Sequence, residues 1–503
     1  MPLLAAALAL VIQQQIEAKH PMPFRRVSRE QFLAAVANAG DDPVALMRAV
    51  AMLRDGHTQL FPNFNRWFPV RFYALTDGLF ITAADKRFPQ LAGAKVLRIG
   101  NRTAEEAMRD VESMFSSDNE FRAKEAAALL SSAQIAKLDV LPLDVQLRDG
   151  TTAHVDIPSF PGKAGFDWIQ WGEMYGPPGA ELVTAFDKDP PLHLKSRQAY
   201  WFTYLDAPRA VYAQINAMAD KSKATPETFV QFVERLFAFV DLHPVDKLIF
   251  DIRYNGGGNG RLIKPIVHAL IKREDRGLRL YAISGRKTFS AGLGLLIALR
   301  QETSAILVGE PPGAPMNAAG DPDTAALEGF RLSVSTNYFV GAKFRDDSAF
   351  IPVQIPAQLS SADYFGGRDP ALEAILAPDA VTILDALSTR GGAAAKVLYE
   401  KRKALYGALP WWEPFERVAM NGAGLTLLEQ GKVADAVAAL EMNVDRYPST
   451  WETWDSLAEA LMAAKETARA IAAYERALAI NPDNWNAEAE KKAIAAMRAT
   501  ARP

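Results

Sequence analysis

A regular alternation of short apolar strands and helices between residues 210 and 309 constrains the fold of this chain more than any other feature. Four short apolar segments have the composition of buried strands, at 210–215, 247–252, 278–283 and 305–309. Apolar residues at helical spacing predict helices between them, over 226–240, 262–271 and 291–301. Strands that alternate with helices in this way form a largely parallel sheet. We therefore predict an α/β core within residues 159–400.

Two parts of the chain precede this core. Residues 1–60 form an N-terminal helical region, with helices expected to about Ala18, over 29–38 and over 43–53. Residues 61–158 contain short strands and one helix at 104–114, which predicts an α+β module. This module is either PDZ-like or a generic insertion. A long loop or hairpin is expected over 158–195, where several prolines and glycines show no clear period.

The last part, residues 401–503, is rich in alanine and contains an internal repeat. Tyr447-Pro448 and Asn481-Pro482 lie 34 residues apart. The unit between them matches the tetratricopeptide pattern, with Trp454, Leu457, Ala458, Leu461, Ala470, Tyr474 and Ala477. A more degenerate unit precedes it, and a capping helix is expected over 486–497. We therefore predict an all-α domain of tetratricopeptide-like repeats.

Composition excludes several classes of function. The 56 basic and 59 acidic side chains give a net charge of -3, and no basic run is interleaved with aromatic residues, so nucleic-acid binding has little support. The chain has no cysteine, which excludes disulfides, thiolate metal sites and a cysteine nucleophile. The six histidines show no zinc-protease spacing. No metal or other cofactor is implied.

The N-terminus carries an apolar run over residues 3–12, which is too short to span a bilayer. Its length suits a signal peptide, but no basic residue precedes it and glutamines follow where a cleavage site should have small residues. An amphipathic first helix is therefore the preferred interpretation. No membrane-spanning segment is predicted.

Two segments of the core have the composition of a nucleophile site. The sequence LIFDIRYNGGGNG (248–260) is an apolar strand followed by glycines, whose backbone amides can approach a ligand closely and stabilise an oxyanion. About thirty residues later, TFSAG (288–292) places Ser290 where a helix begins, next to free amides and a partial positive charge. Serine is also a favoured N-cap, so Ser290 taken alone could simply start the helix.

Five motifs in order favour the catalytic interpretation. DGHT (55–58), DIRYNGGG (251–258), TFSAG (288–292), VGEP (308–311) and GRDPAL (367–372) together resemble the tail-specific protease family, which includes the tricorn core. The resemblance covers roughly residues 20–385 and implies a ClpP/crotonase-like core, often joined to a PDZ domain. It implies serine peptidase activity near peptide C-termini, with Ser290 as nucleophile and an oxyanion hole formed by Ala291 and by Gly256 or Gly257.

The general base is where the family divides. Tail-specific members use a lysine 25 residues after the serine, and this chain has Pro315 there. The resemblance therefore implies the tricorn-like solution, in which His57 is the base, and an imidazole suits that role at neutral pH. The third group is not recoverable, and Glu310, Asp55 and Asp346 are the candidates. Asn317 and Asp321 are expected in a substrate-binding loop or a plain polar turn.

The sequence thus predicts a serine peptidase that hydrolyses peptide bonds of proteins or peptides, with a possible protein partner for the C-terminal repeats. The alternative is a weak or inactive protein that binds a peptide or another ligand on the same fold. Relatives are often exported, which favours a periplasmic or secreted location, and a cytoplasmic one stays open. The substrate and the oligomeric state are unknown.

Overall fold

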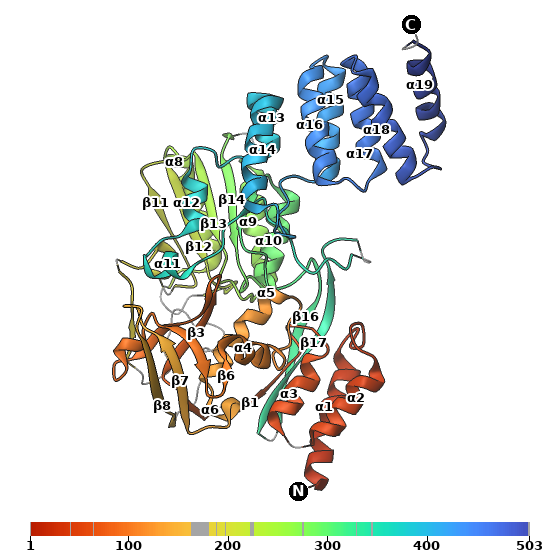
Figure 1. Ribbon diagram of the computed structural model, residues 1–503. Helices are drawn as coiled ribbons and strands as arrows, with labels where there is room; N and C mark the ends of the chain where they lie inside the picture. Colours follow the sequence, from red (N-terminus) through yellow and green to blue (C-terminus); the bar gives the residue numbers. More distant parts are fainter. Residues whose placement is uncertain are drawn as a thin grey trace. The chain divides into compact units, whose positions relative to one another are not determined.

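A computed structural model describes residues 2–40, 42–63, 65–161, 181–187, 189–196, 198–221, 226–273, 276–327, 329–343 and 346–500. The chain divides into two compact units, of which the first consists of Met1–Ile351 and Ala357–Leu376 and the second of Pro352–Pro356 and Ala377–Pro503. The predicted fold class is confirmed, because the first unit mixes helices with sheets and the second is mainly helical (Figure 1). In the part of the chain that the structure describes, no helix is long and apolar enough to cross a membrane.

The N-terminal region contains three helices and ends in a strand. The elements are α1 (Pro2–Lys19), α2 (Arg29–Ala39), α3 (Pro43–Ala51) and β1 (Gln59–Pro62). Helix α2 begins at a capping box formed by Ser28 and Gln31. Helix α3 begins where Asp42 accepts a hydrogen bond from the backbone of Val44. Ile12 of α1 is fully buried in the core, so the first helix packs as part of this unit.

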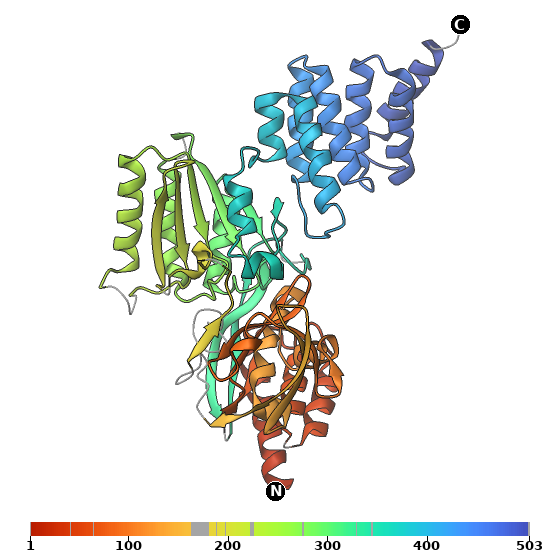
Figure 2. The ribbon, with the colours of Figure 1, turned by 60° about the vertical axis from the view of Figure 1, so that its left-hand side comes forward.

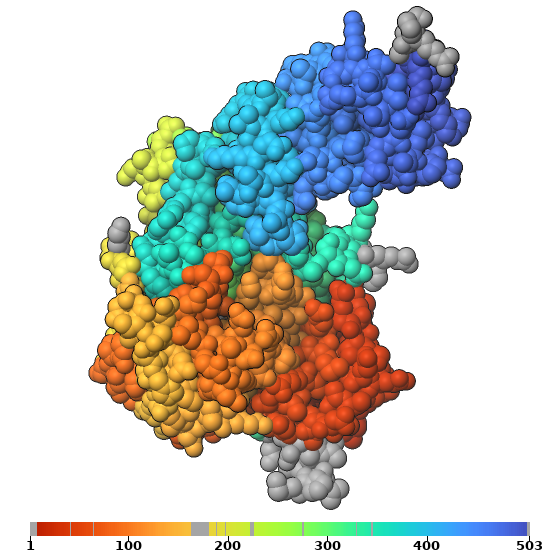
Figure 3. Space-filling model, viewed as in Figure 1, coloured from red at the N-terminus to blue at the C-terminus, as the bar shows by residue number. Residues whose placement is uncertain are grey.

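The module that follows is an antiparallel sheet with one main helix. Its sheet has the order β10-β4-β5-β7-β8, with β3 paired to β4 and β6 paired to β5. The strands are β3 (Val70–Leu75), β4 (Gly78–Asp85), β5 (Lys95–Ile99), β6 (Arg102–Thr103), β7 (Val140–Gln146), β8 (Thr152–Pro158) and β10 (Leu182–Thr184). The helices are η1 (Pro89–Leu91), α4 (Ala104–Glu112), α5 (Glu120–Ala123), η2 (Lys124–Ser131) and α6 (Ala133–Ala136). Figure 3 shows this module side by side with the N-terminal region, and one hydrophobic core joins the two.

Residues 158–195, for which a long loop or hairpin was expected, contain short elements. These are strand β9 (Phe160–Pro161), which pairs with β2 (Arg66–Trp67), strand β10, and the turn η3 (Leu192–Leu194). The part of that expectation that concerns residues 162–180 lies outside the described residues.

The α/β core has the strand order β11-β12-β13-β14-β15 (Figures 1 and 2). Its strands are β11 (Tyr200–Leu205), β12 (Ala210–Ile215), β13 (Lys247–Asp251), β14 (Arg279–Ser284) and β15 (Ile306–Gly309). The accompanying helices are α8 (Phe229–Leu242), η4 (Gly260–Leu262), α9 (Ile263–Ile271) and α10 (Ala291–Glu302). Strands β12 to β15 are parallel, which confirms the predicted alternation. The antiparallel strand β11 was not predicted.

A long hairpin and two short helices complete the first unit. The hairpin consists of β16 (Asn317–Leu327) and β17 (Phe330–Val340), and the helices are α11 (Ser361–Phe365) and α12 (Pro370–Leu376). Strand β17 pairs antiparallel with β1, so the order of this sheet is β1-β17-β16. The hairpin therefore runs from the core to the N-terminal helices, which lie 250 or more residues earlier in the chain (Figure 1).

The second unit is a series of helices after a short strand. The elements are β18 (Ile355–Pro356), α13 (Ile383–Arg390), α14 (Gly392–Tyr406), α15 (Arg417–Glu429), α16 (Val433–Arg446), α17 (Trp451–Ala463), α18 (Thr467–Ile480) and α19 (Ala487–Thr500). Small residues let the paired helices approach closely. A Cβ added to Gly424 on α15 would come within 2.6 Å of Leu440 on α16, and Ala436, Ala458 and Ala470 are fully buried. The predicted repeats thus correspond to the pairs α15–α16 and α17–α18, followed by α19.

Candidate active site

Ser290 lies between β14 and α10 in a backbone conformation that is unusual for serine. Its φ is 53° and its ψ is -128°. Residues other than glycine rarely adopt a positive φ, and such strain is concentrated at functional sites. The hydroxyl makes no hydrogen bond to the N-terminus of α10. Ser290 therefore stands at the N-cap position of α10 without capping the helix through its side chain.

The glycine-rich turn faces this serine directly. Gly257 has a φ of 113°, and a Cβ added to it would lie 2.5 Å from Ser290 Cβ and 3.0 Å from Ser290 Oγ. The two segments are joined by a hydrogen bond of 2.9 Å from the backbone amide of Phe289 to the carbonyl of Asn255. Only glycine leaves room for the serine side chain here, which explains the glycine at this position.

The backbone amides around Ser290 differ in their availability. The amide of Gly257 donates to the Asn255 side-chain oxygen over 3.0 Å. The amides of Ala291 and Gly256 make no hydrogen bond within the described part of the chain. The added Cβ at Gly257 would lie 3.0 Å from the Ala291 nitrogen, so this amide lies next to the glycine turn. Ala291 and Gly256 are therefore the amides free to stabilise an anion.

His57 reaches this site from the N-terminal region, in the turn between α3 and β1. Asp55 fixes that turn, because one carboxylate oxygen accepts the His57 amide over 3.0 Å. Its other oxygen accepts hydrogen bonds from Thr58 Oγ1 over 2.5 Å, Ser335 Oγ over 2.6 Å and His20 Nε2 over 3.0 Å. The His57 ring stacks on Phe289, with 4.2 Å between ring centroids and 27° between planes. The structure thus places His57 against the residue that precedes Ser290.

The environment of His57 favours its neutral form. Burial and, to a smaller extent, the charge of Arg122 lower the pKa of the imidazole to about 4, although Asp55 and Asp321 oppose this change. Within the described residues, neither ring nitrogen has a hydrogen-bond partner of good geometry. The carbonyl of Ala319 is nevertheless near enough to raise the pKa of the ring. His57 is consequently neutral at pH 7, with a nitrogen lone pair available to accept a proton.

In the described part of the chain, none of the three candidate third groups makes a hydrogen bond to the His57 ring. Glu310 pairs with Arg286, with 3.3 Å between Oε2 and Nε. Asp346 accepts a hydrogen bond from the Ser348 amide. Asp55 binds the backbone of His57, and within the described residues it makes no hydrogen bond to the ring. Although burial raises the pKa of the Asp55 carboxyl, hydrogen bonds from His20, Ser335 and Thr58 and the charge of His57 lower it to about 2.

Asn317 and Asp321 belong to strand β16, where a loop or turn was expected. The Asn317 amide group donates to the carbonyl of Lys343 over 2.6 Å, and its oxygen accepts from the amide of Ala342 over 3.0 Å. Asn317 thus fastens the chain that follows the hairpin. Asp321 is exposed, has a φ of 54°, and accepts a hydrogen bond from Asn337 over 2.9 Å. Its charge acts on His57, so of the two it is the one placed near the site.

The motifs DIRYNGGG and GRDPAL contact each other at the strand end that precedes the glycine-rich turn. Arg253 of DIRYNGGG binds Asp369 of GRDPAL through both terminal nitrogens, over 3.0 and 2.8 Å. Arg253 also pairs with Asp251, and His193 Nδ1 lies 3.0 Å from Asp369. These groups are buried, and Arg253 and His193 hold the pKa of Asp369 far below its usual value despite the burial. This network holds the strand end from which the glycine turn begins.

Sequence reasoning missed four polar residues that surround His57. His20 and Ser335 hold Asp55, Asp118 Oδ2 accepts the Gly56 amide over 2.9 Å, and Arg122 packs on Phe289. Burial, with Asp55 nearby, raises the pKa of Asp118 to about 8. No local pattern marks these residues, since they come from separate segments that meet only in the folded chain.

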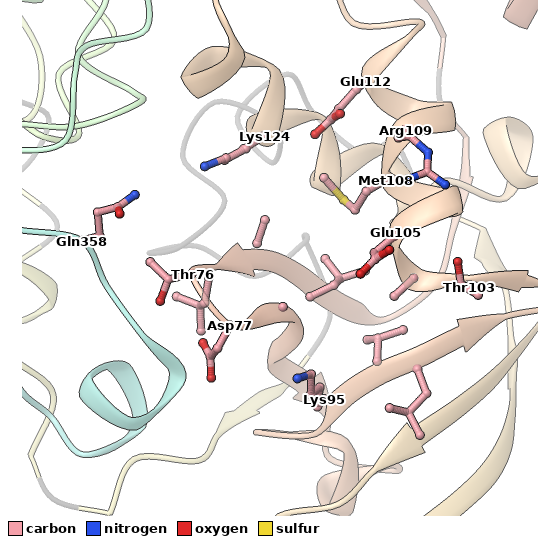
Figure 4. A pocket seen from close by; sticks show the side chains of 17 residues that line it. Thr76, Asp77, Lys95, Thr103, Glu105, Met108, Arg109, Glu112, Lys124 and Gln358 are labelled. Carbon is pink, nitrogen blue, oxygen red and sulfur yellow. The ribbon is translucent and has the colours of Figure 1, made fainter. Parts of the chain in front are cut away.

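A cavity of about 870 Å³ lies in the α+β module of the first unit, among the hairpin β3–β4, strand β5 and helix α4. Figure 4 shows that both acidic and basic side chains surround it. They are Asp77, Lys95, Glu105, Arg109, Glu112 and Lys124. Burial raises the pKa of Glu112. The cavity is therefore lined by charged groups of both signs.

The fold and this site define a mixed α/β protein with a strained serine facing a glycine turn. The chain is similar to a serine-to-alanine mutant of CPAF, with a TM-score of 0.56 and 11% identity over 74% of this chain and 96% of that chain. It is also similar to mature CPAF complexed with lactacystin, with a TM-score of 0.54 and 10% identity over 74% of this chain and 97% of that chain. About three quarters of the chain, 74% of its residues, therefore has the fold of CPAF.

Other comparisons add to this picture. Residues 421–484 match the tetratricopeptide repeat family, which confirms the predicted repeats. The photosystem II D1 C-terminal processing protease superposes more loosely, with a TM-score of 0.35 and 12% identity over 70% of this chain and 92% of that chain. No curated protein sequence matches the chain.

Proposed function

We propose that this protein is a serine peptidase with Ser290 as its nucleophile and His57 as its general base. One observation carries the proposal most directly. Ser290 has a positive φ, and its hydroxyl does not cap helix α10. It faces Gly257, where any side chain larger than hydrogen would overlap with it. Strain of this kind costs roughly 1–3 kcal/mol and persists where the surrounding structure imposes it. A helix cap alone would require none of it.

The reaction begins with proton transfer from Ser290 Oγ to a ring nitrogen of His57 as Oγ attacks the carbonyl carbon of the peptide. The oxyanion that forms accepts hydrogen bonds from the amides of Ala291 and Gly256. His57 then gives its proton to the leaving amine as the C–N bond breaks. Water, deprotonated by the same ring, hydrolyses the acyl-serine ester and regenerates the hydroxyl.

Among the described residues, no carboxylate holds the His57 ring through a hydrogen bond. Stacking on Phe289 and the backbone bond to Asp55 supply the orientation instead. A base with a pKa of about 4 accepts a proton less readily than one near 7, so we expect a slow peptidase.

The α+β module is proposed to act as a PDZ-like domain that holds one end of the peptide in its cavity, so that cleavage falls near the C-terminus. Lys95, Arg109 and Lys124 supply positive charge there, and Asp77, Glu105 and Glu112 supply negative charge. The tetratricopeptide repeats are proposed to bind a protein partner, as such concave helical arrays do.

Active-site labelling tests the proposal. The purified protein is treated with an alkyl fluorophosphonate, and the modified residue and its rate are read by mass spectrometry. We expect wild type to be modified at Ser290, Ser290→Ala to stay unmodified, and His57→Ala to react at least about 100-fold more slowly, since general base catalysis contributes about 10²–10⁴-fold. Failure of wild type to react would favour a ligand-binding protein on this fold.

A further inference from the structure

Arg122 lies in the candidate active site, although no motif of the sequence marks it. It belongs to the short helix α5, and its guanidinium carbon is 4.0 Å from the centroid of the Phe289 ring. The His57 ring stacks on the same phenyl ring at 4.2 Å. Two groups so close to one ring centre cannot share a face, so guanidinium, phenyl and imidazole form three layers beside Ser290.

This guanidinium has no anionic partner. In the described part of the chain, its side chain makes no hydrogen bond and no ion pair within 4.0 Å, and Nε is buried. Two arginines of the same unit differ from it: Arg253 pairs with two carboxylates and Arg286 with Glu310. A guanidinium keeps its charge at any physiological pH, so burying it without a partner is costly.

Two nearby carboxyl groups act on the charge of Arg122 without forming an ion pair with it in the described part of the chain. Asp118 and Glu125 are close enough to act on Arg122 electrostatically. Glu125, however, pairs with Lys287 over 3.4 Å, and burial favours the protonated form of Asp118. In the described part of the chain, the guanidinium therefore has hydrogen-bond donors that no carboxylate accepts, which leaves them available to a bound anion.

We infer that Arg122 binds a carboxylate of the substrate beside the scissile bond and so determines specificity. The inference rests on the proposed peptidase function. A guanidinium binds a carboxylate through two parallel hydrogen bonds, and exclusion of water strengthens them. The carboxylate is either the C-terminal one of a peptide or that of an Asp or Glu side chain.

Binding of a carboxylate here also affects the base. Arg122 disfavours protonation of His57, and a bound carboxylate would cancel that charge. An acidic substrate thus makes His57 a stronger base at the moment it is needed, whereas a neutral substrate of the same shape leaves it weak. Arg122 in this way links recognition to the rate of proton transfer.

The first test uses two fluorophosphonates whose alkyl arms end in a carboxylate or in the isosteric carboxamide, each at several arm lengths. Wild type is expected to react with the best carboxylate probe about 10- to 100-fold faster than with its carboxamide, as charged hydrogen bonds allow. In Arg122→Gln the two probes should react at rates equal to each other, because the charge that distinguishes them is gone. The carboxamide rate shows that the variant's Ser290 site is intact.

Two further variants complete this test. Arg122→Lys keeps the charge and the aliphatic packing but lacks the planar fork, so it should retain only part of the preference. Arg235→Gln is the matched control, because Arg235 also stacks on aromatic rings, at 4.6 Å from the Phe202 centroid, but lies on α8. It should keep the full preference.

To decide which carboxylate Arg122 binds, one peptide library is prepared with free and with amidated C-termini, and both forms are digested. Cleavage that is lost on amidation identifies the C-terminal carboxylate, and enrichment of Asp or Glu at one position in both libraries identifies a side chain. Equal reaction of wild type with both probes, or a preference that survives in Arg122→Gln, overturns the inference while leaving the peptidase proposal intact. Absence of any labelling of wild type overturns the peptidase proposal and the inference together.

Discussion

Replacement of Gly257 by alanine should disable Ser290 while leaving the fold in place. The added Cβ would lie 2.5 Å from Ser290 Cβ, whereas carbon atoms pack at about 3.5–4.0 Å, so one of the two must move by about 1 Å. The φ of 113° adds strain of roughly 1–3 kcal/mol for a residue with a side chain. A 1 Å displacement of a reacting group can cost about 100-fold in rate. We therefore expect the rate of Ser290 labelling to fall at least about 100-fold.

Gly256→Ala is the matched control for this prediction. An added Cβ at Gly256 would meet no atom within 4 Å, and its φ is not positive, so the labelling rate should stay within about threefold of wild type. Fluorophosphonate labelling followed by mass spectrometry measures both rates, and circular dichroism on heating checks that both variants fold. A folded Gly257→Ala protein that labels at the wild-type rate would refute the proposed contact between the glycine turn and the nucleophile.

Three other predictions concern the base, the buried network and the repeats. Because His57 must be neutral to accept a proton, the labelling rate should be level at pH 5–7 and fall as the pH drops through about 4; a midpoint near 6.5 would show that the ring is not in this environment. Asp369→Asn leaves the buried charge of Arg253 poorly paired, so urea denaturation should show a loss of about 3 kcal/mol or more in the free energy of unfolding, and a loss under about 1 kcal/mol would contradict this. Gly424→Ala should destabilise the repeats by about 1–3 kcal/mol, because its Cβ would come within 2.6 Å of Leu440 on the facing helix. Gly422→Ala on the same helix meets no atom within 4 Å and should stabilise them. Equal shifts of the melting temperature in the two variants would count against the packing described.

Apolar periodicity was sufficient to predict the α/β core, because its strands are buried and its helices have one apolar face. Strand β12 begins and ends at the predicted residues, and the neighbouring elements deviate by at most a few residues. The hairpin strand β16 could not be found in this way. Its sequence, NAAGDPDTAAL, contains Gly, Pro and Asp, which disfavour strands. It is a strand because it pairs along its whole length with β17, and such pairing overrides local preference.

The candidate site likewise contains contacts that the sequence predicts and others that it does not. The contact between Gly257 and Ser290 follows from two motifs that end neighbouring parallel strands, since the ends of such strands meet at one edge of the sheet. Arg122 and Asp118 lie in a segment with no motif, and their place beside His57 depends on how the α+β module packs within the first unit. Asn317 was expected in a substrate-binding loop or a polar turn, and in the structure it lies on β16 and fastens the chain after the hairpin.

The pairing of β1 with β17 has a consequence for synthesis of the protein. Ser335 donates to Asp55 and its amide donates to Thr58, so residues far downstream hold the turn that carries His57. A nascent chain that has exposed Ser290 but not residue 335 still lacks this support for its base. We therefore expect the growing polypeptide to stay inactive on the ribosome until the hairpin has emerged and closed on the N-terminal strand.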